Sequence, residues 1–463
     1  MTAAHTHDAA ASRLRSWIEA LVPVLAMATL AAAATAQTTQ GQGPGELTLA
    51  AALREIAANS SAAVAAGLEV ESARENTKRS QASYYPTVSV DAGHINRDHE
   101  VVAKFLALSA PELERDFFTA EIDATELLWD GGRRSSGVKA ARSLESAAVM
   151  RGEASVRFAQ LEGLKTYLQI LALKAQRLVV SQRTASLQDH LREVKDLFEQ
   201  GVVARNDLLA TEVRLRTVQD QNSQLDNVEA VAAQALNRLL GRNPSDPLAL
   251  PGALPSPPPL SVGPDELKRR AVEGNQQLLA LRARAAAEQD AVALRKADSY
   301  PTVIAQLSHT YQQNQYLVYP NANILFFGLN WQAYDGGARK ASVREAQLAV
   351  AKTAQEIVDL ERQLQIQVEQ AYRDYEQALK EAATAETNVQ AAVENLRIEE
   401  DQYKAGLART TDVLDAESVL ADSRFSLVNQ HYNAYVKQGA LLTVSGEDLP
   451  AFFATVTPGR LEH

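Results

Sequence analysis

Two aspartates, Asp412 and Asp415, stand three residues apart where a helical sequence pattern starts, shortly after Gly406. Residues i and i+3 share one face of a helix, so both carboxylates can point to the same side. Carboxylates that are held close together repel one another, which raises their pKa values and favours cation binding. A simpler interpretation is that Asp412, beside Thr410 and Thr411, caps the helix and stabilises its start by ~1 kcal/mol.

A similar sequence pattern occurs earlier in the chain, around Gly201. The equivalent positions are Gly201 and Gly406, Asp207 and Asp412, Leu209 and Leu414, and Glu212 and Glu417. Asp415 has no acidic counterpart, because the first copy has Ala210 at that place. The capping interpretation therefore applies to Asp207 and Asp412 alike, whereas Asp415 needs another explanation.

A second duplicated motif is Asp-Gly-Gly, which resembles a nucleotide-binding loop only superficially. The chain has no Gly-x-x-x-x-Gly-Lys and no Gly-x-Gly-x-x-Gly, so we interpret both copies as turns between a strand and a helix. The motif residues are Asp130, Gly131, Gly132, Asp335, Gly336 and Gly337. We expect His94 and His99 to lie in or near a loop, and no further ligand spacing accompanies them, so we expect no metal site. No Ser/His/Asp or paired acid/base arrangement is present, and we expect neither an enzyme nor a cofactor.

Each half of the chain also has two runs in which apolar and polar residues alternate, as in a strand with one apolar face. The runs lie near residues 87–92, 117–125, 302–308 and 325–332. Aromatic residues crowd their ends, as expected of belts at two lipid headgroup layers. A soluble sandwich with one face on its core has the same alternation, so the pattern alone leaves both possibilities open.

Two proline-free stretches, 135–200 and 338–404, predict helices of ~100 Å, too long for a compact globule. Each ends at a glycine, Gly201 or Gly406, and a shorter helical pattern follows, so we expect two antiparallel helical hairpins. Their apolar residues recur at spacings of three and four, which is typical of helices packed on helices.

Composition and order give the domain organisation. We expect a signal peptide over residues 1–36, a first repeat over 37–240, a proline-rich linker over 241–264, a second repeat over 265–446 and a tail over 447–463. The net charge of -11 argues against a nucleic-acid partner. The chain has no cysteine, which excludes a lipid-bearing N-terminal Cys.

The four strands cannot form a membrane barrel within one chain, because the smallest such barrels have about eight strands. Open strand edges in hydrocarbon leave backbone groups without hydrogen bonds, at several kcal/mol each. Several copies must therefore share one barrel, and the long hairpins would then surround the same axis. A tube of this kind is a conduit.

This whole arrangement resembles the TolC-like outer membrane factors of Gram-negative bacteria. The resemblance covers nearly the whole mature chain. It implies a mixed, mainly α fold in a homotrimer, in which four strands per protomer form a shared 12-stranded barrel in outer membrane lipid above a periplasmic α-barrel. It also implies an exit duct for efflux or type I secretion, which works with a periplasmic adaptor and an inner membrane transporter of RND or ABC type.

The resemblance further implies roles for individual residues. Asp412 and Asp415 correspond to the carboxylate rings at the narrowest level of the periplasmic mouth. Tyr403 corresponds to a tyrosine that contacts a carboxylate, here Asp207, and the family's arginine falls beside Arg409, one residue away. Adaptor docking is expected at the hairpin tips, which here carry Gly201, Val202, Gly406 and Leu407.

Two other classes of protein stay open on the sequence. A periplasmic coiled-coil adaptor or a structural protein without a channel needs only the hairpins, usually one. A soluble enzyme needs a pocket that the sequence does not indicate. The strands and the paired hairpins together favour the channel.

Overall fold

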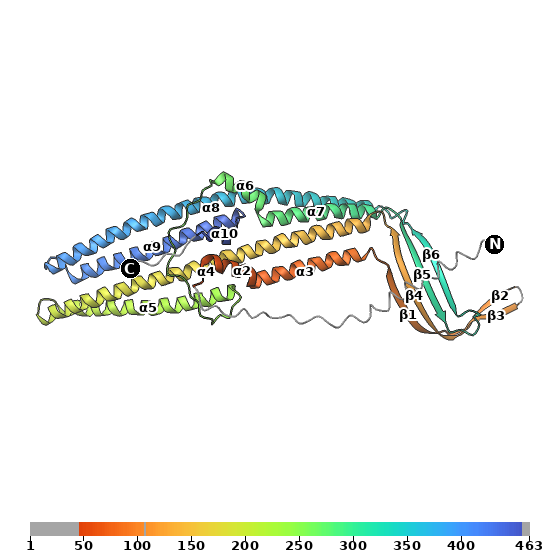
Figure 1. Ribbon diagram of the computed structural model, residues 1–463, viewed down its shortest axis with the longest axis horizontal. Coiled ribbons are helices and arrows are strands. Elements are labelled where there is room, and N and C mark those ends of the chain that lie inside the picture. The colour runs from red at the N-terminus through yellow and green to blue at the C-terminus, as the bar shows by residue number, and fades with distance from the viewer. Residues whose placement is uncertain (1–45, 106–107, 456–463) are drawn as a thin grey trace. The chain divides into compact units, whose positions relative to one another are not determined.

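The computed structural model describes residues 46–105 and 108–455 (Figure 1). The expected signal peptide and the final residues of the expected tail lie outside these ranges. None of the helices within them is both long and apolar enough to cross a membrane.

The internal duplication extends to the lengths of the helices. α2 (Leu49–Asn59) and α6 (Pro264–Gly274) have 11 residues each, and α3 (Ser61–Ala82) and α7 (Gln276–Ala297) have 22 each. α4 (Arg133–Glu199) and α8 (Ala338–Lys404) have 67, and α5 (Arg205–Leu239) and α9 (Thr410–Val444) have 35. The mainly α fold with two long helical hairpins is therefore confirmed.

Four strands form one antiparallel sheet in the order β1-β4-β5-β6. Their bounds are β1 Thr87–Asn96, β4 Asp116–Trp129, β5 Thr302–Gln312 and β6 Asn321–Asn330. The register places Val90 opposite Ile122 and Asp91 opposite Glu121, so apolar and polar residues lie on opposite faces. The four expected strands are thus confirmed.

A short additional hairpin lies between β1 and β4. It consists of β2 (Val101–Phe105) and β3 (Leu108–Leu113), which form a separate two-stranded sheet. The sequence does not predict this hairpin, because β3 contains Pro111 and neither strand shows a strict alternation of apolar and polar residues. His94, expected in a loop, lies in β1 and contacts Asp116 of β4.

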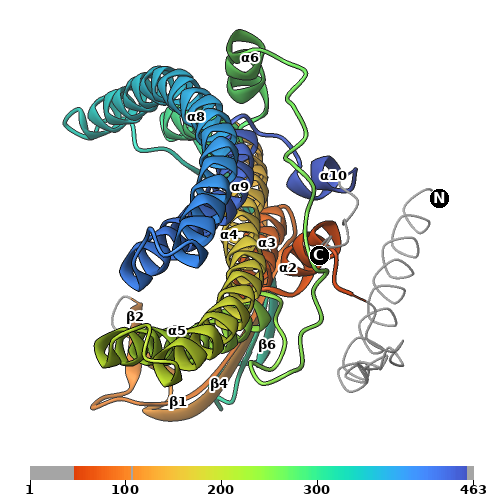
Figure 2. The same ribbon diagram turned by 90° about the vertical axis from the view of Figure 1, so that its left-hand side faces the viewer.

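The helices pack in two successive rows. Near the sheet the neighbouring helices are α3, α4, α7 and α8, and near the hairpin tips they are α5, α4, α9 and α8. Figure 2 views the hairpins from the tips, where α8, α9, α4 and α5 form a curved row. In the tip row, α9 lies between α4 and α8, whereas α5 lies at an edge.

The largest apolar core lies midway along α4, where α2, α5, α9 and α10 (Leu449–Phe453) meet it. Its largest fully buried side chains include Ile56, Tyr167, Leu236, Tyr435 and Phe453. The proline-rich segment 241–264 covers this core, because Tyr435 Oη donates to Pro255 O at 2.8 Å and Gln438 Nε2 donates to Pro258 O at 2.5 Å. The segment is thus packed on the helices, although its prolines prevent it from forming a long helix.

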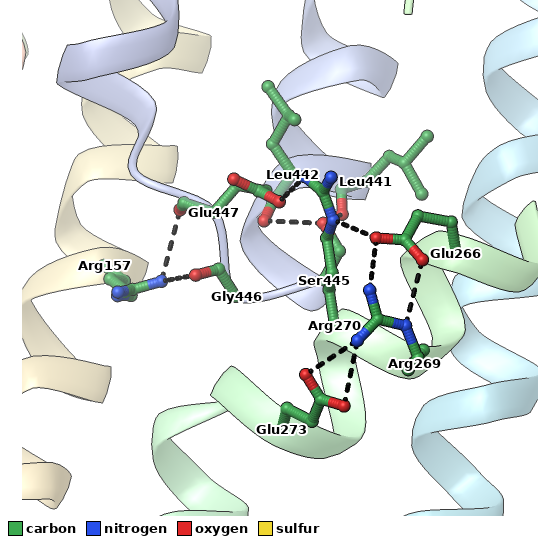
Figure 3. Close-up of polar contacts among 10 residues, drawn as sticks. All are labelled: Arg157, Glu266, Arg269, Arg270, Glu273, Leu441, Leu442, Ser445, Gly446 and Glu447. Atoms are coloured by element: carbon green, nitrogen blue, oxygen red, sulfur yellow. Dashed lines mark hydrogen bonds and ion pairs between the residues drawn. The ribbon is translucent and has the colours of Figure 1, made fainter. Parts of the chain in front are cut away.

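A polar network fixes the end of α9 that is remote from the tip (Figure 3). Arg157 of α4 donates to Gly446 O at 2.5 Å and to Glu447 O at 3.2 Å, which satisfies carbonyl groups beyond the helix end. Arg270 of α6 joins the carboxylates of Glu447 and Glu266, each at 2.8 Å. Hydrogen bonds from Arg270 and Arg269 hold the pKa of Glu266 below its usual range. This end of α9 is therefore anchored to two other helices.

Candidate functional site

The first strand-to-helix turn is built around Asp130. Its Oδ1 accepts from Gly132 N at 3.1 Å, and its Oδ2 accepts from Arg134 N at 2.8 Å and Arg134 Nε at 3.1 Å. Gly132 has φ +89, a left-handed conformation that glycine adopts without strain. Arg134 also donates to Ser83 O at 3.3 Å, beyond the end of α3. One side chain thus links the strand, α4 and α3.

The second turn repeats this geometry in detail. Asp335 accepts from Gly337 N at 3.0 Å and from Arg339 N at 2.9 Å, and Arg339 donates to Asp298 O at 3.3 Å, beyond the end of α7. The aspartates and glycines were predicted from the sequence as turn residues, but the two arginines were not. Their signal was visible, because an arginine follows each aspartate by four residues in both copies.

The two turns differ at their first glycine. A Cβ at Gly131 would lie 2.7 Å from Tyr300 Cβ, so the backbone approaches its neighbour too closely for any side chain. Gly336 has nothing within 4 Å of the same position and only its φ of +67 favours glycine. Gly131 is therefore needed for packing as well as for conformation.

Both helical hairpins turn at a left-handed glycine, Gly201 with φ +74 and Gly406 with φ +71. Val202 N donates to Leu197 O at 2.9 Å, and Leu407 N makes the equivalent bond at 2.9 Å, as in a Schellman motif. The motif satisfies carbonyl groups that the end of a long helix would otherwise leave free. Each tip is therefore a defined turn rather than an irregular loop.

Asp207 and Asp412 both act at the helix starts that follow these turns. Asp412 Oδ2 accepts from Arg409 N at 2.8 Å, and Asp207 Oδ2 accepts from Ala204 N at 3.3 Å. In a complete capping box, the side chain of the residue before the helix also accepts a hydrogen bond from the helix backbone. The side chains of Ala204 and Arg409 accept no such bond, so only the half contributed by the aspartate is present. The capping interpretation accounts for both aspartates without reference to a channel.

Asp415 has a different environment. It is exposed and makes no side-chain hydrogen bond or ion pair with any residue in the described ranges. Asp412 is also exposed, whereas Val413, Leu414 and Ala416 are buried against neighbouring helices. Both aspartates thus point away from the packed side of α9, as their spacing predicts.

Tyr403 lies beside α4 rather than beside the first tip. Its hydroxyl accepts from Thr410 Oγ1 at 3.5 Å, and its ring meets that of His190 edge-on with 5.3 Å between centroids. Within the described part of the chain, no polar contact joins Tyr403 to Asp207 or to the exposed side chain of Arg409. The expected latch among these residues stays a prediction, since it involves a mouth that several copies would build.

A polar cavity of about 350 Å³ lies next to Tyr403, between α4, α8 and α9. Two titratable groups border it, the half-buried His190 and the buried Glu417. Burial raises the pKa of Glu417 and lowers the pKa of His190. Glu417 aligns with Glu212 in the sequence but had no predicted role, because the helical pattern does not show which face of the helix is covered. Over the described ranges, no group of three or more His, Asp or Glu side chains is placed to hold a metal ion.

Comparison with known proteins gives a family match over most of the chain. A family model described as "Outer membrane efflux protein" matches residues 52–242 and 267–447, one match in each repeat. A search of curated proteins finds no match.

Several crystal structures share the fold. The outer membrane protein VceC from Vibrio cholerae aligns with a TM-score of 0.72 and 18% identity, over 86% of this chain and 96% of VceC. The Campylobacter jejuni CmeC outer membrane channel aligns with a TM-score of 0.71 and 12% identity, over 89% and 90% of the two chains. The open state of the Neisseria gonorrhoeae MtrE outer membrane channel aligns with a TM-score of 0.69 and 16% identity, over 86% and 89%.

Proposed function

Because the chain belongs to the outer membrane efflux protein family, we propose that it is the outer membrane exit duct of a tripartite efflux or type I secretion system. Its family and its structural neighbours are outer membrane proteins of efflux and channel type, not enzymes. The observation that carries the proposal is a duplicated chain whose sheet and helix rows both end in open edges. Such a unit is complete only when copies of it assemble.

The sheet supports assembly in a membrane. β1 and β6 each have one edge without a partner strand among the described residues. One face of the sheet exposes large apolar side chains, including those of Val88, Val90, Ile122, Leu307, Leu325 and Phe327. The opposite face carries Asp91, Glu121, Asp123 and Ser308. A barrel wall with lipid outside and water inside requires this division, and three copies would give 12 strands.

The hairpin tips support docking of a periplasmic adaptor. Val202 and Leu407, which follow the two tip glycines, are 67% and 80% exposed. Apolar side chains held out by well-defined turns are suited to burial against another protein. We therefore assign the surface around Gly201, Val202, Gly406 and Leu407 to the adaptor, which would join the duct to an inner membrane transporter of RND or ABC type.

Asp412 and Asp415 are the candidates for the narrowest level of the mouth. In a trimer, three exposed pairs would gather six carboxylates around one axis. Unit charges at ~6 Å repel by roughly 3 kcal/mol at an effective dielectric of 20, so the closed mouth needs compensating contacts or bound cations. Tyr403, Asp207 and Arg409 stay the candidates for those contacts.

The first experiment tests assembly and conduction. Purified protein from outer membrane fractions should migrate as an oligomer that heating dissociates, and it should conduct ions in planar bilayers. A monodisperse single copy that conducts, or an oligomer that never conducts, would overturn the proposal. In the latter case, the protein would be an adaptor or structural component.

A second experiment identifies the partner. The chain has no cysteine, so single cysteines near Gly201 and Gly406 would be unique sites for a cleavable crosslinker in cells. Recovery of an adaptor through both tips, but not through a cysteine on the sheet, is the expected result. Recovery with an RND or an ABC transporter would also indicate the class of cargo.

A further inference from the structure

Near the tips, the two hairpins meet around a small apolar core. Its buried members are Val180 and Leu187 of α4, Val218 of α5 and Leu414 of α9. Arg183, Arg214 and Glu417 each lie about one helical turn from one of these residues. We call these three residues the charged layer. Three helices therefore contribute charges to a region that apolar side chains otherwise fill.

The charged layer is poorly satisfied. Glu417 is 6% exposed, and neither of its carboxylate oxygens accepts a hydrogen bond of normal geometry from any residue that the structure describes, although the Ser186 side chain lies near enough to favour the ionised form. Arg183 Nη2 donates instead to Ser418 Oγ at 3.1 Å. Within the same described ranges, the Nε atoms of Arg183 and Arg214 are buried without an acceptor. Each group would gain hydrogen bonds if water reached it.

Such a layer lowers the stability of the packed hairpins. Buried ionic groups lose more hydration than they regain unless they are fully hydrogen-bonded, and apolar replacements of similar volume are often more stable. Two cavities border Glu417, one of about 350 Å³ and one of about 190 Å³, so open space already lies on both sides of it. Separation of α9 from α4 and α5 would let water fill this region.

On the basis of the proposed channel function, we propose that the charged layer of Arg183, Arg214 and Glu417 positions the gate. It weakens the packing of α9 on α4 and α5, so that the α8–α9 hairpin can part from the α4–α5 hairpin near the mouth. The far end of α9 stays fixed by Arg157 and Arg270 (Figure 3). The hairpin would thus move at its tip and not at its base.

Other charged and titratable groups face Glu417 and set the sense of its response to pH. They are Arg183, Asp189, His190 and Glu193 of α4, Arg214 of α5, Glu400, Tyr403 and Lys404 of α8, and Arg424 of α9, while Asp422 acts on Arg183. Arg183 and Arg214 favour the ionised form of Glu417, whereas burial and Glu400 oppose it. Partial burial lowers the pKa of His190 and so favours its neutral ring, which makes its effect on the packing opposite in sense to that of Glu417.

The test compares one apolar replacement with three. Glu417→Leu alone leaves the half-buried Arg183 and Arg214 without a nearby carboxylate that offsets their charge, so amide protection over residues 413–421 should fall about tenfold. The triple variant Arg183→Leu, Arg214→Met, Glu417→Leu removes every charge of the layer, so protection should rise about tenfold and the open probability in planar bilayers should fall. If Glu417 only fills space, the single and the triple variant should shift amide protection in the same direction, and the inference would fail.

The control is Glu212→Gln, at the position in the first repeat that corresponds to Glu417. Glu212 is only half-buried, so this variant should keep the protection and the open probability of the wild type. A triple variant with lower protection would mean that water-bridged ions hold the hairpins together, which overturns the inference. If the protein never conducts ions but its amide exchange changes as expected, the proposed channel function is contradicted, whereas the effect of the charged layer on packing is not.

A measurement on the wild-type protein tests the inference even if the variants fail to assemble. Amides over residues 413–421 should exchange at least tenfold faster than those over residues 432–442 of the same helix, which pack in the main core. Equal protection of the two segments would show that the charged layer does not weaken the packing, and the inference would fail.

Discussion

The two hairpin tips have the same local geometry but different surroundings. Both have a left-handed glycine, a Schellman turn and an aspartate that caps the next helix. However, α5 has five buried residues and α9 has fifteen, although both helices have 35 residues. α5 is therefore an edge helix within the protomer, and α9 is an internal one.

This difference indicates which features of the duplication are local and which depend on packing. The turn glycine and the capping aspartate are the same in both copies because they satisfy backbone groups of their own helix ends. Features that depend on the surroundings differ: Glu417 is buried where the equivalent Glu212 is half-buried, and Asp415 lies where the first copy has Ala210. The candidate carboxylates for the narrowest level of the mouth therefore belong to the second tip.

The largest expected effect concerns the carboxylates of the second tip. Replacing Asp412 and Asp415 together with alanine should weaken block of the channel by multivalent cations on the order of a hundredfold, because about 3 kcal/mol separates binding with and without such charges. The measurement is the blocking constant in planar bilayers. Asp207→Ala in the first tip should leave this constant unchanged, and equal effects at the two tips would remove the distinction between them.

The tip glycines should behave alike, despite their different surroundings. Gly201→Ala and Gly406→Ala force a side chain into a left-handed conformation, which costs about 1–2 kcal/mol locally. Nothing lies within 4 Å of either Cβ position, so backbone strain is the only source of destabilisation. Amide exchange in the turns should accelerate by about tenfold in both. Gly67→Ala, in the helical interior of α3 with open space around it, is the control and should not destabilise.

The pH response should distinguish the tips more subtly. Burial raises the pKa of Glu417 above 4.5, so the packed hairpins bind its proton more tightly than the separated ones. Protection of α9 should therefore fall as pH rises from 4.5 through this raised pKa. A His190→Gln background removes the opposite contribution of His190, whose pKa lies below 6.5.

In that background, Glu417→Gln should abolish the pH response, and Glu212→Gln should keep it. Protection factors corrected for the intrinsic exchange rate at each pH give the comparison. A response that persists without Glu417 would assign it to another group.

The smallest effect concerns the two caps. Asp207→Asn and Asp412→Asn keep an acceptor but remove the charge at the helix start, so each should destabilise its helix by about 0.5 kcal/mol. Exchange of the first amides of α5 and α9 measures this loss. A much larger loss at Asp412 than at Asp207 would show that the cap is not its main role.

Much of the fold follows from the sequence, and the reasons are local. Proline-free stretches with apolar residues three and four apart predict the long helices, and glycine followed by a capping aspartate predicts where each hairpin turns. The β2–β3 hairpin was missed because Pro111 and the weak alternation hide it. Arg134 and Arg339 were not predicted, although they occupy equivalent positions in the two repeats. Their role depends on hydrogen bonds to the ends of helices about 40 or more residues away in the chain.

The sequence by itself determined the duplication, the helices and strands, the turns and the caps, because these depend on residues close together in the chain. Only the tertiary structure decided that Tyr403 lies against His190, that Arg157 holds the end of α9, and that Glu417 is buried without a hydrogen-bond partner among the described residues. The physical reason is that burial and charge environment depend on which helices pack together. A repeated motif specifies each hairpin but not the neighbours that it will have.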